Sequence, residues 1–364
     1  MATERHTYSD LPIPPGEYFA EVLKEKGITQ AEIARRMGRP AQAINEIISG
    51  RKAITPGTAL QLECTLGVPA HIWTGLEARF QLIKACQQEM GQLKEELPLL
   101  NQIPYKTLSQ MGFVEETRNK LNKIRELHRF FGVSALSNMT DVKAYAPAFR
   151  CARRRNASPY ALAAWLKCAE ICAHKTQKKS FVKDCLLSCI PKIRELTFES
   201  PAMFEPKLKE LLADCGVALM LMPHFPKTYA HGAAFWLNQE TAVIVMSIRG
   251  SWADIFWFSF FHELAHILLH KKHQIFIDDG NVNPEMRDKE EEADRFATDQ
   301  LIPPEIYQKY VSLSSFTAES VQEFAIKVGI ATGIVVGRLQ HDGLLIQNSR
   351  LNTLRDRFRW KINK

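Results

Sequence analysis

The first ninety residues place apolar side chains three or four positions apart, in short runs separated by glycines. This is the spacing of amphipathic helices, and Gly27, Gly38 and Gly50 stand where three such helices would end. Thr29 and Thr55 precede two of the runs, where a threonine hydroxyl can cap a first turn. Two short helices joined by a glycine-containing turn form a helix-turn-helix unit. We therefore predict an all-α domain over residues 1–90, with a small core of Ile33, Ala34, Met37, Ile44 and Ile47.

Residues 91–200 have a helical and charged pattern with few turn signals. The clearest amphipathic helix there is SPYALAAWLKCAEICAHK, which Ser158 can cap. After residue 200 the pattern changes. LKELLADCGVALMLM predicts a helix and then a strand, and GAAFWLNQETAVIVMSI predicts two strands around a polar turn at Asn238 and Gln239.

Two helices are predicted after these strands. DIFWFSFFHELAHILLHKK is strongly apolar, and RDKEEEADRFATDQLIPP ends at Pro303 and Pro304. Residues 201–310 thus predict an α+β domain with a small sheet. In residues 311–364, SVQEFAIKVGIATGIVVGRLQHDG predicts a helical module with a glycine-containing turn, and the tail LNTLRDRFRW predicts another helix. The predicted fold is multidomain and mainly α.

The composition is that of a soluble globular protein, because 46% of the 364 residues are hydrophobic and 24% are charged. No apolar run has the length of a membrane-spanning helix, and the N-terminus lacks a signal-peptide pattern, so we expect a cytoplasmic protein without a membrane partner. The eight cysteines are scattered. Cys168 and Cys172, and Cys185 and Cys189, are each four residues apart, which favours reduced helix thiols over a four-thiolate metal site.

The net charge of +7 is concentrated in the middle of the chain. Residues 1–75 carry equal numbers of basic and acidic side chains, and residues 76–200 carry nine more basic than acidic ones. Such a surface can attract phosphates or an acidic partner, although a solvated helical face explains it equally well. The clustered basic residues are Arg150, Arg153, Arg154, Arg155, Lys175, Lys178, Lys179 and Lys183.

The segment FFHELAHILLH contains the pattern H-E-x-x-H at His262, Glu263 and His266. Residues four apart on a helix share a face, so two imidazoles can bind one ion, and Glu263 can act as the base for a water beside it. Zinc fits best, because it accepts nitrogen and oxygen ligands and keeps one position for water. A core helix with satisfied histidines is the alternative.

A catalytic zinc site needs a third protein ligand. His270 lies one turn too far along the helix, and His273 lacks the spacing of a longer zinc motif. Glu290 stands three residues before Ala293 on the buried face of the later helix, closer to that face than its two acidic neighbours. Asp294 is placed one turn on, where it can orient a ligand histidine. We therefore predict His262, His266 and Glu290 as ligands and Glu263 as the catalytic base.

Together, HELAH and E-E-E-A-D-R-F-A at residues 290–297 resemble the ImmA/IrrE family of bacterial zinc metallopeptidases, over about residues 200–345. The resemblance implies a zincin-like fold, with zinc held by the two histidines and the glutamate. Relatives often read S-L-R-Y-K before the active-site helix, whereas Ser247 to Ser251 reads S-I-R-G-S here. Oxyanion stabilisation needs a donor near the cleft. The candidates beside the predicted hairpin are Tyr229, His231 and Arg249.

Residues 14–90 resemble the HigA-type antitoxins of the XRE helix-turn-helix class, through I-T-Q-A-E-I-A and I-N-E-I-I-S-G-R-K-A-I-T-P. The resemblance implies DNA binding. Gln42, Ala43 and Asn45 then begin the recognition helix and face base edges, while Gln30 lies near the phosphates. The residues expected to contact phosphates are Arg39, Arg51 and Lys52. The neutral charge and Glu46 weaken binding, which a homodimer could restore. The alternative is a helix-turn-helix that serves only as a protein-docking or dimer unit.

These features predict a cytosolic zinc endopeptidase fused to a DNA-binding antitoxin-like domain. It would regulate transcription, or a toxin–antitoxin, stress or anti-phage response, by cleaving a specific protein partner such as a toxin or repressor. The alternative is a non-proteolytic antitoxin or repressor whose zinc domain senses a partner. The glutamate of H-E-x-x-H favours the enzyme, because a sensor has no need of a base.

Overall fold

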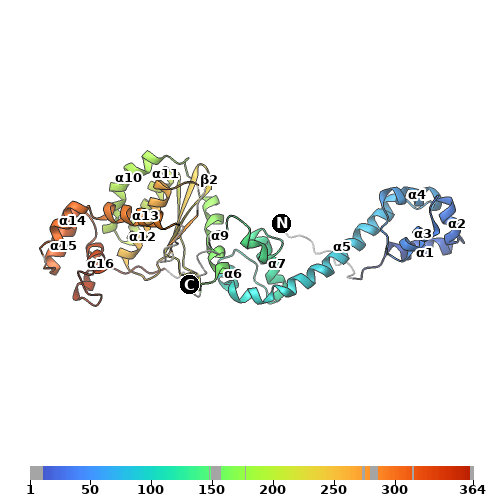
Figure 1. The fold of residues 1–364 in the computed structure, drawn as a ribbon, viewed down its shortest axis with the longest axis horizontal. Coiled ribbons are helices and arrows are strands. Elements are labelled where there is room, and N and C mark those ends of the chain that lie inside the picture. Colours follow the sequence, from blue (N-terminus) through green and yellow to red (C-terminus); the bar gives the residue numbers. More distant parts are fainter. Residues whose placement is uncertain are drawn as a thin grey trace. The chain divides into compact units, whose positions relative to one another are not determined.

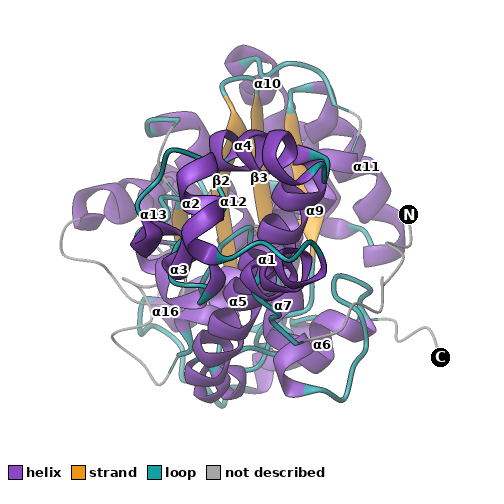
Figure 2. Ribbon diagram, turned by 90° about the vertical axis from the view of Figure 1, so that its right-hand side faces the viewer, coloured by secondary structure: helices purple, strands orange, loops and turns teal. Residues whose placement is uncertain are grey.

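The computed structural model describes residues 11–146, 148, 157–176, 178–272, 275–278, 286–313 and 315–360. The chain forms two compact units, Met1–Leu97 and Pro98–Lys364. Helices make up most of both, and the strands form one small sheet in the second (Figure 2). The predicted mainly helical, multidomain fold is confirmed. The four-segment division made from the sequence stays a prediction.

The N-terminal unit contains five helices among its described residues (Figure 1), and its predicted helices and caps are confirmed. The Thr29 hydroxyl accepts a hydrogen bond from the Glu32 amide, and Thr55 accepts one from Thr58. Gly16 is required by packing, since a Cβ there would overlap the carbonyl oxygens of Ile47 and Ile48. The helices are α1 (Pro15–Glu25), α2 (Gln30–Arg36), α3 (Ala41–Ile48), α4 (Pro56–Leu66) and α5 (Ala70–Glu95).

The core of this unit lies between the helix-turn-helix and the first turns of α5. Phe19 and Trp73 are completely buried and contact edge to face, with ring centroids 5.8 Å apart. Ile33, Ile44 and Ile47 are also buried, which fixes α2 and α3 against each other. The five predicted core residues all belong to this cluster.

The C-terminal unit begins with helices and then forms a four-stranded sheet. The helices before the first strand are η1 (Leu97–Gln102), α6 (Tyr105–Gln110), α7 (Lys120–Phe131), η2 (Leu136–Thr140), α9 (Pro159–Lys175), α10 (Lys183–Glu195), η4 (Leu196–Phe198) and α11 (Pro201–Asp214). The strands are β1 (Val217–Leu221), β2 (Gly232–Asn238), β3 (Thr241–Met246) and β4 (Phe276–Asp278). The helices after β3 are α12 (Ala253–Leu269), α13 (Arg287–Leu301), α14 (Pro304–Val311), α15 (Ala318–Val328), α16 (Thr332–His341) and η6 (Arg350–Leu354).

The sheet has the strand order β1-β3-β2-β4. β3 pairs with β1 in parallel and with β2 antiparallel, and β4 pairs antiparallel with β2. Every residue of β3 is buried, as expected of a strand covered on both faces. In Figure 1, α9 and α12 lie on opposite sides of the sheet, and both contact β2 and β3. The predicted hairpin and the cap at Ser158 are confirmed.

The C-terminal tail differs from its prediction. Only Arg350–Leu354 forms a short 3-10 helix, and the chain then extends so that Arg357 pairs with Trp252. Extension brings Phe358 onto Phe204 and Phe256, and places Arg355 against Asp254 at 2.7 Å. Tertiary contacts at the start of α12 therefore override the helical spacing of the tail.

Within the described residues, no individual helix combines the length and apolarity needed to cross a membrane. Only α15 and α16 taken together meet that length and composition criterion, and they are bent by 109° at their junction.

Candidate metal centre and DNA-contact residues

α12 and α13 pack side by side and turn three nitrogen and oxygen atoms toward one point. The Nε2 atoms of His262 and His266 are 2.9 Å apart. Glu290, on α13, places Oε2 3.1 Å from the first nitrogen and 3.6 Å from the second. The histidines are four residues apart on one helix face, so both rings reach the glutamate.

The charges of this group suit a cation. Burial lowers the pKa of His266 to about 4, which keeps its ring neutral and leaves a nitrogen lone pair available. Burial opposes ionisation of Glu290, but hydrogen bonds from His262 and His266 outweigh it and lower its pKa to about 2. The pKa of His262 is raised, because Asp294 and Glu290 outweigh its burial. A neutral imidazole beside a carboxylate is a donor set that zinc accepts.

The separations also fit zinc. Nitrogens at the usual zinc–imidazole distance of about 2.0–2.1 Å around a tetrahedral ion lie roughly 3.3 Å apart. The two Nε2 atoms at 2.9 Å need to separate only slightly to reach that spacing. His262, His266 and Glu290 therefore fit this metal.

The second nitrogen of each histidine is also engaged. His262 Nδ1 lies 2.9 Å from Asp294 Oδ1. His266 Nδ1 lies 2.9 Å from Nδ1 of His270, whose Nε2 is 3.1 Å from Glu292 Oε2. One assignment satisfies this chain: His266 Nδ1–H donates to His270, and His270 Nε2–H donates to Glu292. With an ion bound in place of the Nε2 protons, His262 Nδ1–H would donate to Asp294, and both Nε2 lone pairs would face the ion.

Glu263 is completely buried beside this centre. Neither carboxylate oxygen has a partner with good hydrogen-bond geometry among the described residues. Burial raises the pKa of Glu263 well above its usual value, although His262 and the backbone of Asp278 favour the charged form. Gly232 of β2 leaves the space for this side chain, since a Cβ there would lie 2.7 Å from Glu263 Oε1.

The three oxyanion candidates occupy different positions. The Arg249 guanidinium donates to the Tyr229 carbonyl and lies over the Tyr229 ring, 5.1 Å from its centroid, so these two residues form a pair with each other. The His231 amide donates to the Asp278 carbonyl at 2.7 Å, which joins β2 to β4 next to Glu263. The donor for the oxyanion is thus not assigned by these contacts.

The sequence analysis did not predict the roles of four further residues of the site. His270, set aside as a ligand, orients His266, and Glu292 reaches it from α13. Phe276 of β4 stacks on His266, with ring centroids 4.0 Å apart. Gly232 is the fourth such residue, and only the pairing of β2 beside α12 identifies it. The repeat of histidines at 262, 266 and 270 was the one available clue.

Part of the basic middle region can be placed. The Lys178 ammonium donates to the Ala173 and Thr176 carbonyls, and Lys179 pairs with Asp214 at 2.8 Å. These two lysines thus have partners within the protein. This favours an ordinary solvated surface over a site for phosphates or an acidic partner. Arg150, Arg153, Arg154, Arg155 and His273 lie outside the described residues.

In the N-terminal unit, α3 exposes Gln42 and Asn45, and Ala43 is half-buried. The Gln42 amide donates to Glu46 at 3.0 Å, and Arg51 donates to Asn45 at 3.1 Å. Contacts with bases would have to replace these local hydrogen bonds.

The residues expected to contact phosphates differ in their exposure to solvent. Gln30, Arg51 and Lys52 are exposed. Arg39 is half-buried and donates to Gln61 of α4 at 2.7 Å, so it also has a structural role.

Comparison with known proteins places both units in families. The family model described as helix-turn-helix matches residues 19–73, and the peptidase M78 model, described as IrrE N-terminal-like domain, matches residues 227–339. The first defines a DNA-binding class, and the second indicates metallopeptidase activity in general. In its N-terminal unit the chain belongs to the XRE-type helix-turn-helix family, and its C-terminal unit contains an IrrE-like M78 domain.

Individual relatives match the N-terminal unit. An uncharacterised HTH-type transcriptional regulator of Escherichia coli, YddM, is 28% identical over 71 residues, which is 20% of this chain and 76% of the relative. Virulence-associated protein I of Dichelobacter nodosus is 31% identical over 88 residues, or 24% and 81% of the two chains. A solved HigA-family addiction module antidote protein from Coxiella burnetii is 27% identical and covers 23% of this chain and 94% of its own, with a TM-score of 0.22.

Proposed function

We propose that this protein is a zinc-dependent endopeptidase that carries its own DNA-binding domain and regulates transcription by cleaving a specific protein partner. One observation carries the enzymatic part. Two imidazole nitrogens and a carboxylate oxygen from α12 and α13 converge within 4.8 Å of one another, beside a buried glutamate with no hydrogen-bond partner in good geometry among the described residues. A structural histidine pair would not need that unsatisfied carboxylate.

The chain's own residues divide the work of peptide hydrolysis. His262, His266 and Glu290 would hold zinc, which supplies Lewis acidity toward water and the scissile carbonyl. Asp294 and the His270–Glu292 pair fix the two rings in the orientation that binding requires. Glu263 takes the proton from the attacking water and gives it to the leaving amine. Burial raises the pKa of Glu263, which favours uptake of the proton from water and leaves a carboxylic acid that can return it to the amine.

A neighbouring cavity supports a peptide substrate with an apolar side chain. It is lined on α12 by Ile255 and Phe258 and on α13 by Thr298 and Leu301. Phe258 precedes His262 by one helical turn, and their ring centroids are 6.4 Å apart. The face that carries the ligands therefore continues into an apolar recess, where a side chain next to the cleaved bond can bind.

The N-terminal domain would bring this activity to a DNA site. We infer that Gln42 and Asn45 read base edges, with Gln30, Arg51 and Lys52 on phosphates. A charge-neutral domain gains little affinity from phosphates, so a homodimer on two half-sites is the arrangement we expect. We infer that the cleaved partner is a repressor or a toxin.

The decisive variant is Glu263→Gln, which keeps the size of the side chain and removes the base. We expect unchanged zinc content and loss of all proteolysis. The measurement compares new protein N-termini in cells that express the wild type, Glu263→Gln, or Glu291→Gln as the control. Glu291 is exposed and pairs with Arg287 at 2.9 Å, so its variant should cleave normally.

The same comparison separates the enzyme from a non-proteolytic regulator. Identical N-termini in the wild type and Glu263→Gln, together with an unchanged transcriptional response, would exclude the peptidase and leave a zinc-holding sensor. Absence of zinc from the purified wild type would exclude both.

A further inference from the structure

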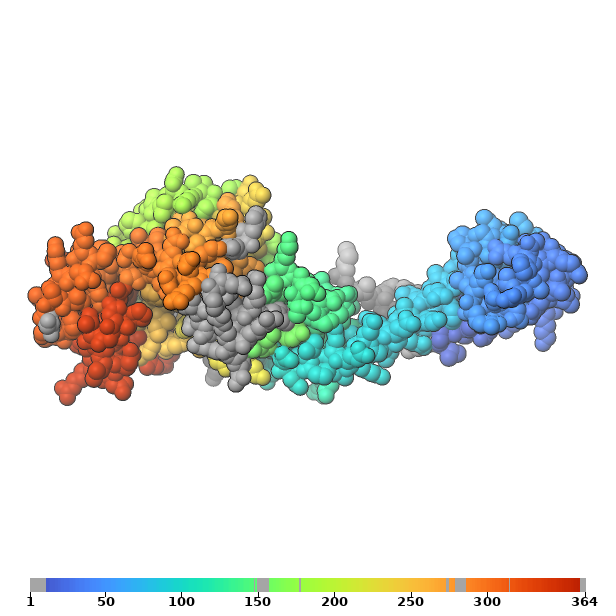
Figure 3. All heavy atoms as spheres, in the orientation of Figure 1, coloured from blue at the N-terminus to red at the C-terminus, as the bar shows by residue number. Residues whose placement is uncertain are grey.

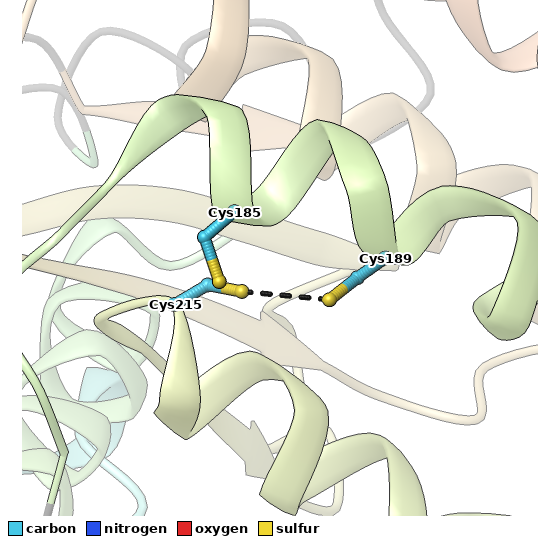
Figure 4. Close-up of side chains that lie close together, drawn as sticks. All are labelled: Cys185, Cys189 and Cys215. Carbon is cyan, nitrogen blue, oxygen red and sulfur yellow. Dashed lines mark hydrogen bonds between the residues drawn. The ribbon is translucent and has the colours of Figure 1, made fainter.

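Three cysteines from two helices meet at one point in the C-terminal unit, outside the histidine centre. Cys185 and Cys189 lie one turn apart on α10, and Cys215 follows α11 (Figure 4). Their sulfur atoms all lie within 4.8 Å of one another, and Cys189 Sγ is 3.6 Å from Cys215 Sγ. The sequence paired Cys185 with Cys189 but gave no sign of the third thiol.

We propose that Cys185, Cys189 and Cys215 form a binding site for one soft, thiophilic cation, either Zn²⁺ or Cu⁺. Sulfurs at about 2.3 Å from a tetrahedral zinc ion lie roughly 3.8 Å apart, so the observed pair needs almost no movement. Thiolate ligands select these cations over hard ones. On binding, each thiol loses its proton to solvent and its sulfur bonds to the ion.

Burial raises the pKa of the Cys215 thiol, so the ion has to displace its proton, whereas two features near Cys185 stabilise a thiolate. Cys185 stands in the first turn of α10, where the helix dipole stabilises negative charge. The Lys179 ammonium adds positive charge near Cys185 and Cys215. The Asp214 carbonyl lies 4.0 Å from Cys185 Sγ, on the side where Cys185 is partly exposed.

A bound ion would tie α10 to the end of α11, from which β1 begins. α10 also carries Arg194, whose guanidinium donates to the Leu301 carbonyl at the end of α13 and to Val328 at the end of α15. α13 is the helix of Glu290, so the cysteine site would stabilise the support of the histidine centre. The proposal does not depend on peptidase activity.

The chain contains a matched control. Cys168 and Cys172 on α9 have the same spacing, with one buried and one half-buried thiol. Among the described residues, no further cysteine, histidine, aspartate or glutamate joins them to make a cluster. A metal site that needs the third thiol should therefore form on α10 and not on α9.

The test uses the reduced full-length protein and Co²⁺ as a probe, because only thiolate ligands give intense sulfur-to-cobalt charge-transfer absorption. We expect this absorption in the wild type, in His266→Ala and in Cys168→Ala/Cys172→Ala, and its complete loss in Cys189→Ala. Competition with Zn²⁺ and, separately, with Cu⁺ then identifies the preferred ion. No absorption in the folded wild type, or full absorption in Cys189→Ala, would overturn the proposal.

A second measurement needs no variant and so does not depend on folding of a mutant. Saturation of the wild type with Zn²⁺ or Cu⁺ should protect the half-buried Cys185 and Cys189 from alkylation, while the exposed Cys64 and Cys86 react as before. Equal alkylation of Cys185 and Cys189 with and without both ions, or a Cys189–Cys215 disulfide, contradicts a metal site.

Discussion

Glu290 and Glu292 stand two positions apart on α13 and have different partners at the metal centre. Glu290 reaches both Nε2 atoms, whereas Glu292 reaches only His270, which in turn contacts His266. The Glu292 side chain is 57% exposed. Its hydrogen bond to His270 is therefore the solvent-exposed end of a hydrogen-bonded series that runs from Glu292 through His270 to the buried His266. In Figure 3, α13 (orange) forms part of the surface of the C-terminal unit.

The first prediction concerns this hydrogen-bonded series. Glu292→Gln should weaken zinc affinity by about 10–100-fold, because His270 loses the carboxylate that fixes its tautomer and that of His266. A chelator competition at constant pH measures the change. Glu291→Gln is the matched control, being the neighbouring glutamate on the solvent side, and should bind zinc like the wild type. Equal zinc affinities for the two variants would show that the hydrogen bonds from Glu292 through His270 to His266 do not support zinc binding.

The second prediction concerns Gly232. Gly232→Ala should lower the free energy of unfolding of the C-terminal unit by about 1–3 kcal/mol, since the new methyl group overlaps the buried Glu263 side chain. Denaturant unfolding measures the loss. Gly75→Ala on α5 has open space around it and should raise stability slightly, by up to about 1 kcal/mol. A wild-type stability in Gly232→Ala would contradict the observed packing.

At the scale of elements, the sequence predicted those whose signals are local. The helix caps at Thr29, Thr55 and Ser158 and the β2–β3 hairpin follow from short patterns, and the structure has them. The strand order β1-β3-β2-β4 and the pairing of β4 depend on contacts between distant segments, which no window of sequence contains. The metal-site residues on α12 were predictable because they form a local sequence pattern. Gly232 and Phe276 were not, because they join the site only through contacts between distant segments.

The third prediction concerns the ion pair that joins the tail to α12. Asp254 and Arg355 are both more than nine-tenths buried, and Arg355 donates to both Asp254 oxygens, at 2.7 and 3.0 Å. Arg355→Met leaves an unpaired buried carboxylate and should destabilise the C-terminal unit by about 3–5 kcal/mol near neutral pH. Equilibrium unfolding measures it, and Arg359→Met, an exposed arginine of the same tail, is the control.

The pH dependence of that loss has a definite sign. Burial raises the pKa of Asp254 even though Arg355 opposes the rise, so removal of Arg355 raises the pKa further. Above that pKa the variant carries the full cost of an unpaired charge. As the pH falls through it, Asp254 is protonated in the variant and the cost decreases. A difference between variant and wild type that grows on acidification would contradict this account.

At the scale of the whole molecule, the two compact units have separate cores and separate candidate binding sites. Residues 1–97 contain the helix-turn-helix with Ile44 at its centre, and residues 98–364 contain both the histidine centre and the cysteine cluster. A metal that binds only a folded unit stabilises that unit alone. The division of the chain therefore predicts that metal content and DNA-domain stability vary independently.

The fourth prediction tests this independence by calorimetry of the full-length protein. Removal of zinc with a chelator should lower the melting temperature of the C-terminal unit by at least about 5 °C and leave that of the N-terminal unit unchanged. Ile44→Ala, which empties a fully buried position, costs about 2–5 kcal/mol and should lower only the N-terminal transition, by roughly 10–20 °C. If either change moved both transitions, the units would unfold together. Zinc would then stabilise the DNA-binding domain as well as the unit that binds it.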